Sequence, residues 1–138
     1  MKREKPVTAI TRNMADNMIK EINIKVIPYR EQRYETYGDY WFDENKVLQV
    51  RASSEDNNGR PFDSRFIYGI ILHELFELGV VQYRNISIDK IEEFDKAYLG
   101  SDPGSHPEAP YHKEHMKALA VEEMFYQEVE FDGTDPIK

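Results

Sequence analysis

The chain has 138 residues, of which 40% are hydrophobic and 32% are charged, and its formal net charge is −8. This composition is typical of one folded domain with its own core. The acidic balance argues against a nucleic-acid partner, because phosphates need a basic surface. The absence of cysteine excludes disulfides and thiolate metal sites, so any metal must be held by His, Asp, Glu or water.

Neither a secretion signal nor a membrane span is expected. Residues 1–5 are basic, but no apolar stretch of the kind found in signal peptides follows them. The longest apolar run, residues 66–72, is too short to cross a bilayer. We therefore expect a cytoplasmic protein without a membrane partner, and the sequence assigns no oligomeric state.

The first half of the chain predicts one helix and three strands. Residues 8–20 predict an amphipathic helix, because Ile10, Met14 and Met18 recur every four residues. The period then changes to two, and residues 22–26 predict a half-buried strand. Two further strands, over the aromatic-rich residues 34–42 and over residues 47–52, are expected to form a hairpin.

The second half predicts helices. Asp63 or Ser64 is expected to open a helix over residues 65–83, which is apolar nearly all the way round and should therefore be central and buried. Further helices are predicted over residues 87–99 and 111–129, with a loop between them, and the tail from Asp132 is expected to fray. Helices and strands in this order predict an α+β domain.

Three ionisable side chains interrupt the apolar helix predicted over residues 65–83. His73 and Glu77 lie about 40° apart on one face, and Glu74 lies about 60° further round from Glu77. Burying carboxylates without partners costs several kcal/mol each. A divalent cation compensates them directly, since imidazole and carboxylate are both good zinc ligands. The alternative interpretation is a paired core histidine with two half-exposed glutamates.

The remaining histidines are His106, His112 and His115. A zinc site needs three or four ligands, and one helix supplies only two. His112 and His115 lie one turn apart at the start of the last predicted helix, so either could face the central helix. Glu122 lies two turns beyond His115 on the same face and could be a ligand or an acceptor for one. The alternative is that residues 111–115 form a solvated first turn.

Residues 72–79, with the sequence LHELFELG, resemble the zinc-binding helix of the zincin metallopeptidases, whose pattern is H-E-x-x-H. The predicted order of elements is also similar to that of minimal zincins. The resemblance implies a single zincin-like domain over residues 1–138. It would have an N-terminal helix, a small three-stranded and mostly antiparallel sheet, a buried motif helix and C-terminal helices.

Carried over by position, the resemblance makes His73 the first zinc ligand and Glu74 the general base that activates the metal-bound water. Glu77 stands where the family has its second ligand histidine. Glutamate can ligate zinc, but its negative charge weakens the metal's acidifying effect on water and favours a harder metal. The candidates for the third ligand are, in order, His115, His112 and Glu122.

Three functions fit these features. The first is a metal-dependent hydrolase that uses zinc, or another divalent metal, on a peptide or protein substrate. The second is a catalytically inactive binding or adaptor module of zincin shape, with a degenerate or structural metal site. The third is a carboxylate-bridged two-metal protein, a class that normally uses four long helices. The strands expected between residues 22 and 52 argue against the third, and the hydrolase is our prediction.

Overall fold

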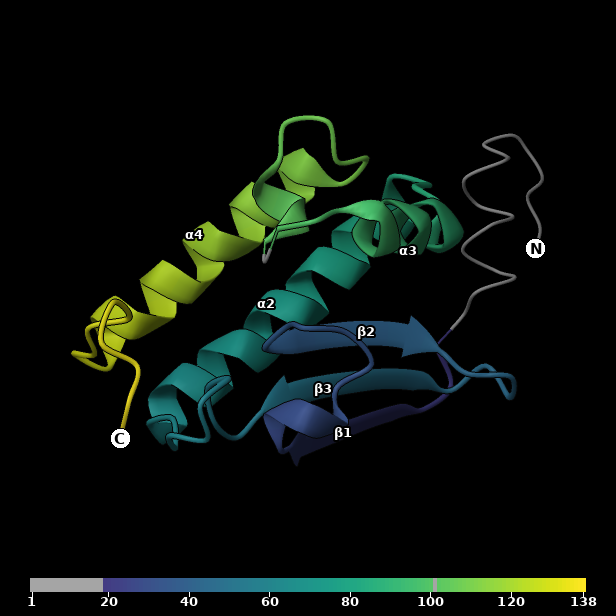
Figure 1. Cartoon of the computed structure of the whole chain (residues 1–138). Coiled ribbons are helices and arrows are strands. Elements are labelled where there is room, and N and C mark those ends of the chain that lie inside the picture. The colour runs from purple at the N-terminus through teal and green to yellow at the C-terminus, as the bar shows by residue number, and fades with distance from the viewer. Residues whose placement is uncertain (1–18, 101) are drawn as a thin grey trace.

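The computed structural model describes residues 19–100 and 102–138. The elements are β1 (Ile22–Ile27), η1 (Tyr29–Glu31), β2 (Gly38–Phe42), β3 (Leu48–Ser53), α2 (Ser64–Tyr83), α3 (Ile88–Ala97), η2 (Pro103–Ser105) and α4 (His112–Glu128). The sheet lies on one side of α2 and α4 lies on the other (Figure 1). The α+β class is therefore confirmed. The helix predicted over residues 8–20 lies, apart from its last two positions, outside the described residues.

The strands form a mixed sheet in the order β1-β3-β2. β2 and β3 are antiparallel, with Phe42 opposite Leu48, as the predicted hairpin requires. β1 runs parallel to β3, with Ile22 opposite Leu48, so the expectation of a mostly antiparallel sheet is wrong. β3 takes the central place because it has the most apolar face: Leu48, Val50 and Ala52 are fully buried, as expected of a strand paired on both edges and covered by a helix.

The second strand is shorter than predicted, because residues 34–37 lie in bends before β2. Tyr37 packs edge-on against Tyr29 and Phe62, with ring centroids 5.6 and 5.0 Å apart. Tyr34 lines a pocket. Tyr34 and Tyr37 therefore pack from the loop, whereas Tyr40, Trp41 and Phe42 lie in β2 and pair with β3.

The central helix α2 begins where the sequence predicts. The Asp63 side chain caps it by accepting a hydrogen bond from the backbone N–H of Arg65. Toward the sheet, Leu78 of α2 packs in a core cluster that includes Leu48 and Val50. By length and composition alone, α2 is apolar enough to cross a membrane. In this fold it lies between the sheet and α4, the position of a core helix.

The C-terminal tail is tied to the body of the domain, so the expectation of fraying is wrong. The backbone N–H of Asp63 donates to the carbonyl of Pro136 at 2.7 Å, and that of Lys138 donates to Pro61 at 2.9 Å. Ile137 forms an isolated bridge with Phe62. These backbone hydrogen bonds hold the tail against the segment that leads into α2, which a local reading of its polar sequence does not predict.

Candidate metal centre

Three potential ligand atoms converge beside α2. His73 Nε2 lies 3.1 Å from Glu77 Oε1 and 3.2 Å from His115 Nδ1, and the last two atoms lie 2.9 Å apart. In a tetrahedral zinc site with bonds of about 2.0–2.1 Å, neighbouring ligand atoms lie about 3.3 Å apart. The triangle is therefore close to the size that one metal ion needs. It is the one group of this kind in residues 19–100 and 102–138.

Two helices and a loop build this group. His73 and Glu77 lie one turn apart on α2, and His115 lies in the first turn of α4. The loop before α4 passes very close to the His115 ring, where a Cβ on Gly104 would lie 2.5 Å from Cγ. Only a residue without a side chain fits there, so Gly104 allows the loop to close over His115.

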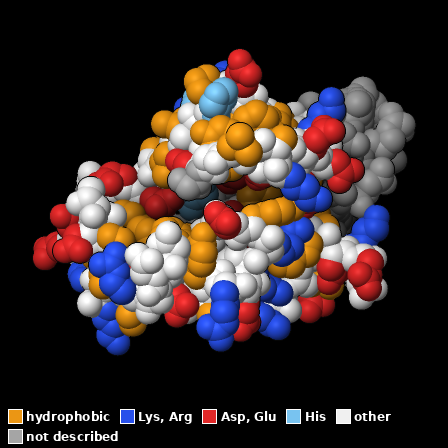
Figure 2. All heavy atoms as spheres, viewed as in Figure 1, with side chains coloured by type: hydrophobic (Ala, Val, Ile, Leu, Met, Phe, Trp, Pro, Cys, Tyr) orange, Lys and Arg blue, Asp and Glu red, His pale blue; other side chains and the backbone are white. Residues whose placement is uncertain are grey.

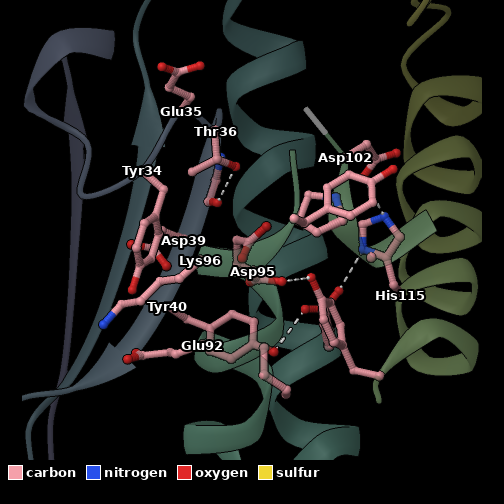
Figure 3. Close-up of a pocket in the computed structure, with 18 of the residues that line it drawn as sticks. Tyr34, Glu35, Thr36, Asp39, Tyr40, Glu92, Asp95, Lys96, Asp102 and His115 are labelled. Carbon is pink, nitrogen blue, oxygen red and sulfur yellow. Dashed lines mark hydrogen bonds and ion pairs between the residues drawn. The ribbon is translucent and has the colours of Figure 1, made fainter. Parts of the chain in front are cut away.

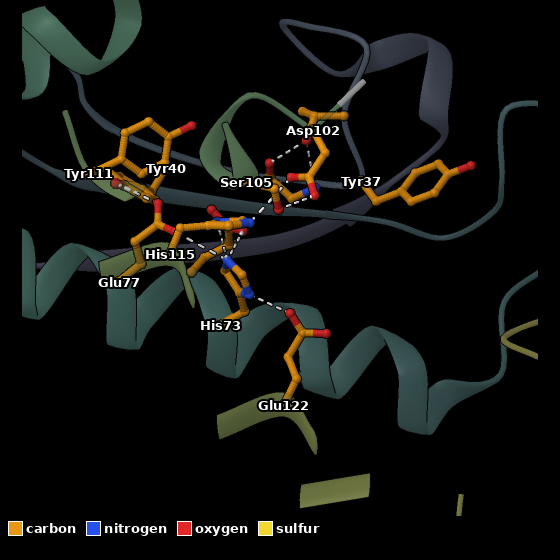
Figure 4. A network of polar contacts seen from close by, with 12 residues as sticks. Tyr37, Tyr40, His73, Glu77, Asp102, Ser105, Tyr111, His115 and Glu122 are labelled. Carbon is orange, nitrogen blue, oxygen red and sulfur yellow. Dashed lines mark hydrogen bonds and ion pairs between the residues drawn. The ribbon is translucent and has the colours of Figure 1, made fainter. Parts of the chain in front are cut away.

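The second nitrogen of each histidine ring faces a carboxylate (Figure 4). His73 Nδ1 donates a hydrogen bond to Glu122 Oε2 on α4. His115 Nε2 lies 3.2 Å from Asp102 Oδ1, in the loop before α4. A carboxylate that accepts a hydrogen bond in this position fixes the tautomer and orientation of a metal-binding histidine and makes it a better ligand. Glu122 does this for His73, whereas Asp102 is within ion-pair distance of His115 without forming a hydrogen bond. Both rings therefore point an imidazole nitrogen at the centre of the triangle.

The second oxygen of Glu77 also has a partner. The Tyr40 hydroxyl of β2 donates a hydrogen bond of 2.8 Å to Glu77 Oε2, while Oε1 faces the two histidines. Glu77 is 3% exposed and Tyr40 is 6% exposed. The carboxylate is thus held between the sheet on one side and the histidines on the other.

The carboxylates around the group raise the pKa of both histidines. Burial lowers the pKa of His73, but the contacts with Glu122 and Glu77 outweigh it and raise that pKa to about 11. Burial also lowers the pKa of His115, and Asp102 and Glu77 raise it to about 9. Burial raises the pKa of Glu77, but the hydrogen bonds from the two histidines bring it below its usual value. The group is therefore organised around positive charge, which a cation can supply in place of the protons.

Glu74 lies beside the triangle and not at one of its corners. Its Oε2 is 4.0 Å from His73 Nε2. Burial raises the pKa of Glu74 well above the usual value, with His73 lowering it and Glu77 raising it further. A Cβ on Gly38 of β2 would lie 2.5 Å from Glu74 Oε2 and 2.7 Å from Ile70 Cγ2. The bare backbone of β2 at Gly38 therefore makes room for this carboxylate.

A pocket of about 440 Å³ opens onto the group. Figure 2 shows a hollow in which histidine and acidic atoms are visible, and Figure 3 shows side chains from β2, α3 and the loop before α4 around it. Acidic side chains predominate among the charged groups of its wall, where Lys96 is the lone Lys or Arg side chain. The acidic residues are Glu35, Asp39, Glu74, Glu77, Glu92, Asp95 and Asp102.

The structure brings together most of the residues that the sequence selects. His73, Glu74, Glu77 and His115 share the site, and Glu122 is the carboxylate partner of His73. His112 lies outside the group, where its Nδ1 is 3.0 Å from the backbone oxygen of Gly104.

Sequence reasoning does not select Tyr40 or Asp102. Strand alternation places Tyr40 on the same face of β2 as Phe42, toward the core, but it carries no information on which group the hydroxyl meets. Asp102 lies in a loop whose path no periodicity fixes. The contacts of both residues arise only when the sheet and the loop close around α2.

Chemically, the group can hold one divalent cation through two imidazoles and one carboxylate, with a carboxylic side chain and a pocket beside it. Comparisons with protein-family models, with curated proteins and with solved structures return no match for this chain. The geometry and charge of the site are therefore the basis on which a function can be assigned.

Proposed function

We propose that this protein is a metal-dependent hydrolase of zincin type that acts on peptides or proteins. His73, Glu77 and His115 would hold zinc or another divalent cation. The observation that carries this proposal is the convergence of three ligand atoms within 2.9–3.2 Å of one another. A salt-bridge network that only stabilises the fold does not require two imidazole nitrogens and a carboxylate oxygen to meet at one point.

A bound divalent cation would supply Lewis acidity, which polarises a peptide carbonyl and lowers the pKa of water. With three protein ligands, a coordination position is left for the reaction. Glu74 lines the pocket, with Oε2 4.0 Å from His73 Nε2, and would accept the proton of the attacking water and return it to the leaving amine. The raised pKa of Glu74 suits this role, because a general base and acid works best near the operating pH.

The charge of the pocket bears on the substrate. Seven acidic side chains, one lysine and two histidines line it, and Arg33 pairs with Asp39 and Glu92. The acidic side chains that remain favour neutral or basic groups over acidic ones. A peptide of neutral or basic sequence fits this wall better than an acidic one. The same charge argues against a nucleic acid as the partner.

The alternative function is a binding or adaptor module of the same shape with a structural metal. Glu77 is the observation that favours it. A carboxylate ligand adds negative charge, which weakens the acidifying effect of a metal on water. A carboxylate-bridged two-metal protein has less support, because the described residues include one candidate metal group and a three-stranded sheet in place of a four-helix bundle.

The test is peptide cleavage by protein loaded with zinc, cobalt or manganese, with metal content measured on the same samples. We expect Glu74→Gln to abolish turnover and to leave metal content unchanged. Glu123→Gln, at an exposed position on α4, is the matched control and should cleave as the wild type does. Glu77→His restores the H-E-x-x-H pattern and should raise turnover if ligand charge limits the reaction. A wild type that binds metal but cleaves no peptide, with no gain from Glu77→His, would establish the binding module instead.

A further inference from the structure

The contact between Tyr40 and Glu77 decides how many oxygens of Glu77 are available to a metal. The two carboxylate oxygens of Glu77 have different surroundings. Oε1 lies 3.1 Å from His73 Nε2 and 2.9 Å from His115 Nδ1, whereas Oε2 accepts the Tyr40 hydroxyl at 2.8 Å. A carboxylate can bind a cation through one oxygen or through both.

We propose that Tyr40 is a positioning residue that restricts Glu77 to binding through Oε1 alone and so keeps one coordination position open. This inference rests on the proposed metal-dependent hydrolase. The donated hydrogen bond occupies Oε2, and the two histidines contact Oε1. With Tyr40 absent, both oxygens of Glu77 could bind the cation, which would raise its coordination number from four to five and crowd the position that a substrate needs.

The sheet gives Tyr40 the rigidity that this role requires. Tyr40 lies in β2 opposite Val50 of β3, and its ring packs in a buried cluster with Leu48, Val50 and Leu78. The hydroxyl therefore approaches Glu77 from β2, a strand that is packed against both α2 and the core. A donor held in this way keeps its direction without cost when the cation binds.

The same hydrogen bond compensates for the unusual ligand. A glutamate at position 77 brings a full negative charge where an imidazole would bring none. A hydrogen bond to Oε2 draws electron density away from Oε1 and weakens its donation to the cation. Tyr40 thereby preserves part of the Lewis acidity that Glu77 would otherwise remove.

The experiment compares Tyr40→Phe with Tyr111→Phe. Tyr111 is an equally buried tyrosine whose hydroxyl also donates to a carboxylate in the pocket wall, Asp95 Oδ1 at 2.7 Å, but Asp95 is not part of the ligand triangle. Both variants are loaded with cobalt(II), whose visible bands are intense in four-coordinate sites and weak at higher coordination numbers. We expect Tyr40→Phe to lose these intense bands, to retain the metal and to lose about 10–100-fold in turnover. Tyr111→Phe should keep the wild-type spectrum.

A wild-type spectrum in Tyr40→Phe would overturn the inference while leaving the proposed function intact. A wild type that takes up no cobalt would overturn both. Because Tyr40→Phe removes a buried hydrogen bond and could destabilise the fold, infrared difference spectra of the wild type on zinc loading provide a second measurement. The spacing of the carboxylate stretching bands should be that of one-oxygen binding, and a spacing typical of two-oxygen binding would overturn the inference without any variant.

Discussion

Glu122 on α4 accepts a hydrogen bond from His73 Nδ1 on α2, across 49 positions of sequence. This contact joins the two helices that supply the candidate ligands. It also directs His73 Nε2 toward Glu77 and His115, because the ring nitrogen that donates to Glu122 is not available for a cation. The same contact therefore packs α4 on α2 and orients His73, the first candidate ligand.

Removing the charge of Glu122 should weaken metal binding. Glu122→Gln takes away the carboxylate that makes His73 a better ligand, and we expect zinc affinity to fall about 10–100-fold. Competition with a chromophoric chelator measures this directly. Glu123→Gln, at the exposed neighbouring position, should leave the affinity unchanged. Equal affinities in the two variants would contradict the role given to Glu122.

The two histidines at the start of α4 should differ in their effect. His115→Ala removes one of the three ligands of the triangle. We expect it to reduce zinc affinity more than Glu122→Gln does, for which the expected loss is about 10–100-fold. His112→Ala should have little effect, since His112 contacts the backbone of Gly104 and not the ligand group. The same chelator competition ranks the two variants. A larger loss in His112→Ala would show that the third ligand is wrongly assigned.

Metal uptake should release protons. The pKa values of His73 and His115 are raised to about 11 and about 9, so both rings are protonated at neutral pH and a cation must displace one proton from each. Glu77, with its lowered pKa, is already ionised and releases none. We therefore expect about two protons per zinc ion at neutral pH, and an affinity that rises steeply with pH up to about pH 9 and less steeply from there to about pH 11. Calorimetric titration in buffers of different ionisation enthalpy counts the protons, and uptake without release would contradict the assignment.

A methyl group at Gly38 should displace the proposed base. In Gly38→Ala the new Cβ would meet Glu74 Oε2 at 2.5 Å and Ile70 Cγ2 at 2.7 Å, so the Glu74 carboxylate must move. Turnover should fall by up to about 100-fold, as for other displacements of a reacting group by about 1 Å, with zinc content unchanged.

The control for this variant is Gly79→Ala. Gly79 lies on the exposed side of α2, and a Cβ there meets no atom within 4 Å. The alanine should raise the free energy of unfolding by up to about 1 kcal/mol, because it favours the helix, and should not change turnover. If Gly38→Ala retains full turnover in a peptide assay, Glu74 is not held against β2 in the way its role requires.

Local periodicity was sufficient for the central features of this protein. The apolar helix with His73, Glu74 and Glu77 on neighbouring faces follows from a repeat of 3.6 residues, and its start follows from the capping side chain of Asp63. Alternation with a period of two identified the first and third strands. Aromatic enrichment over residues 34–42 identified the second, whose first four residues lie outside β2, and its hairpin with β3. The periodicity of an element and its capping residue depend only on residues close together in the chain, so they can be read from the sequence.

Only the tertiary structure decided which distant groups meet. Whether β1 pairs parallel with β3, and whether His115 and not His112 faces α2, depends on how whole elements pack. The donors and acceptors around the ligands, Tyr40 and Asp102, come from a strand and a loop whose side chains gain their partners only on closure. Side-chain spacing within an element is set by backbone geometry, whereas contacts between elements are set by the packing of many side chains at once. The sequence alone therefore determined the face of α2 that carries the site, and the fold determined what surrounds it.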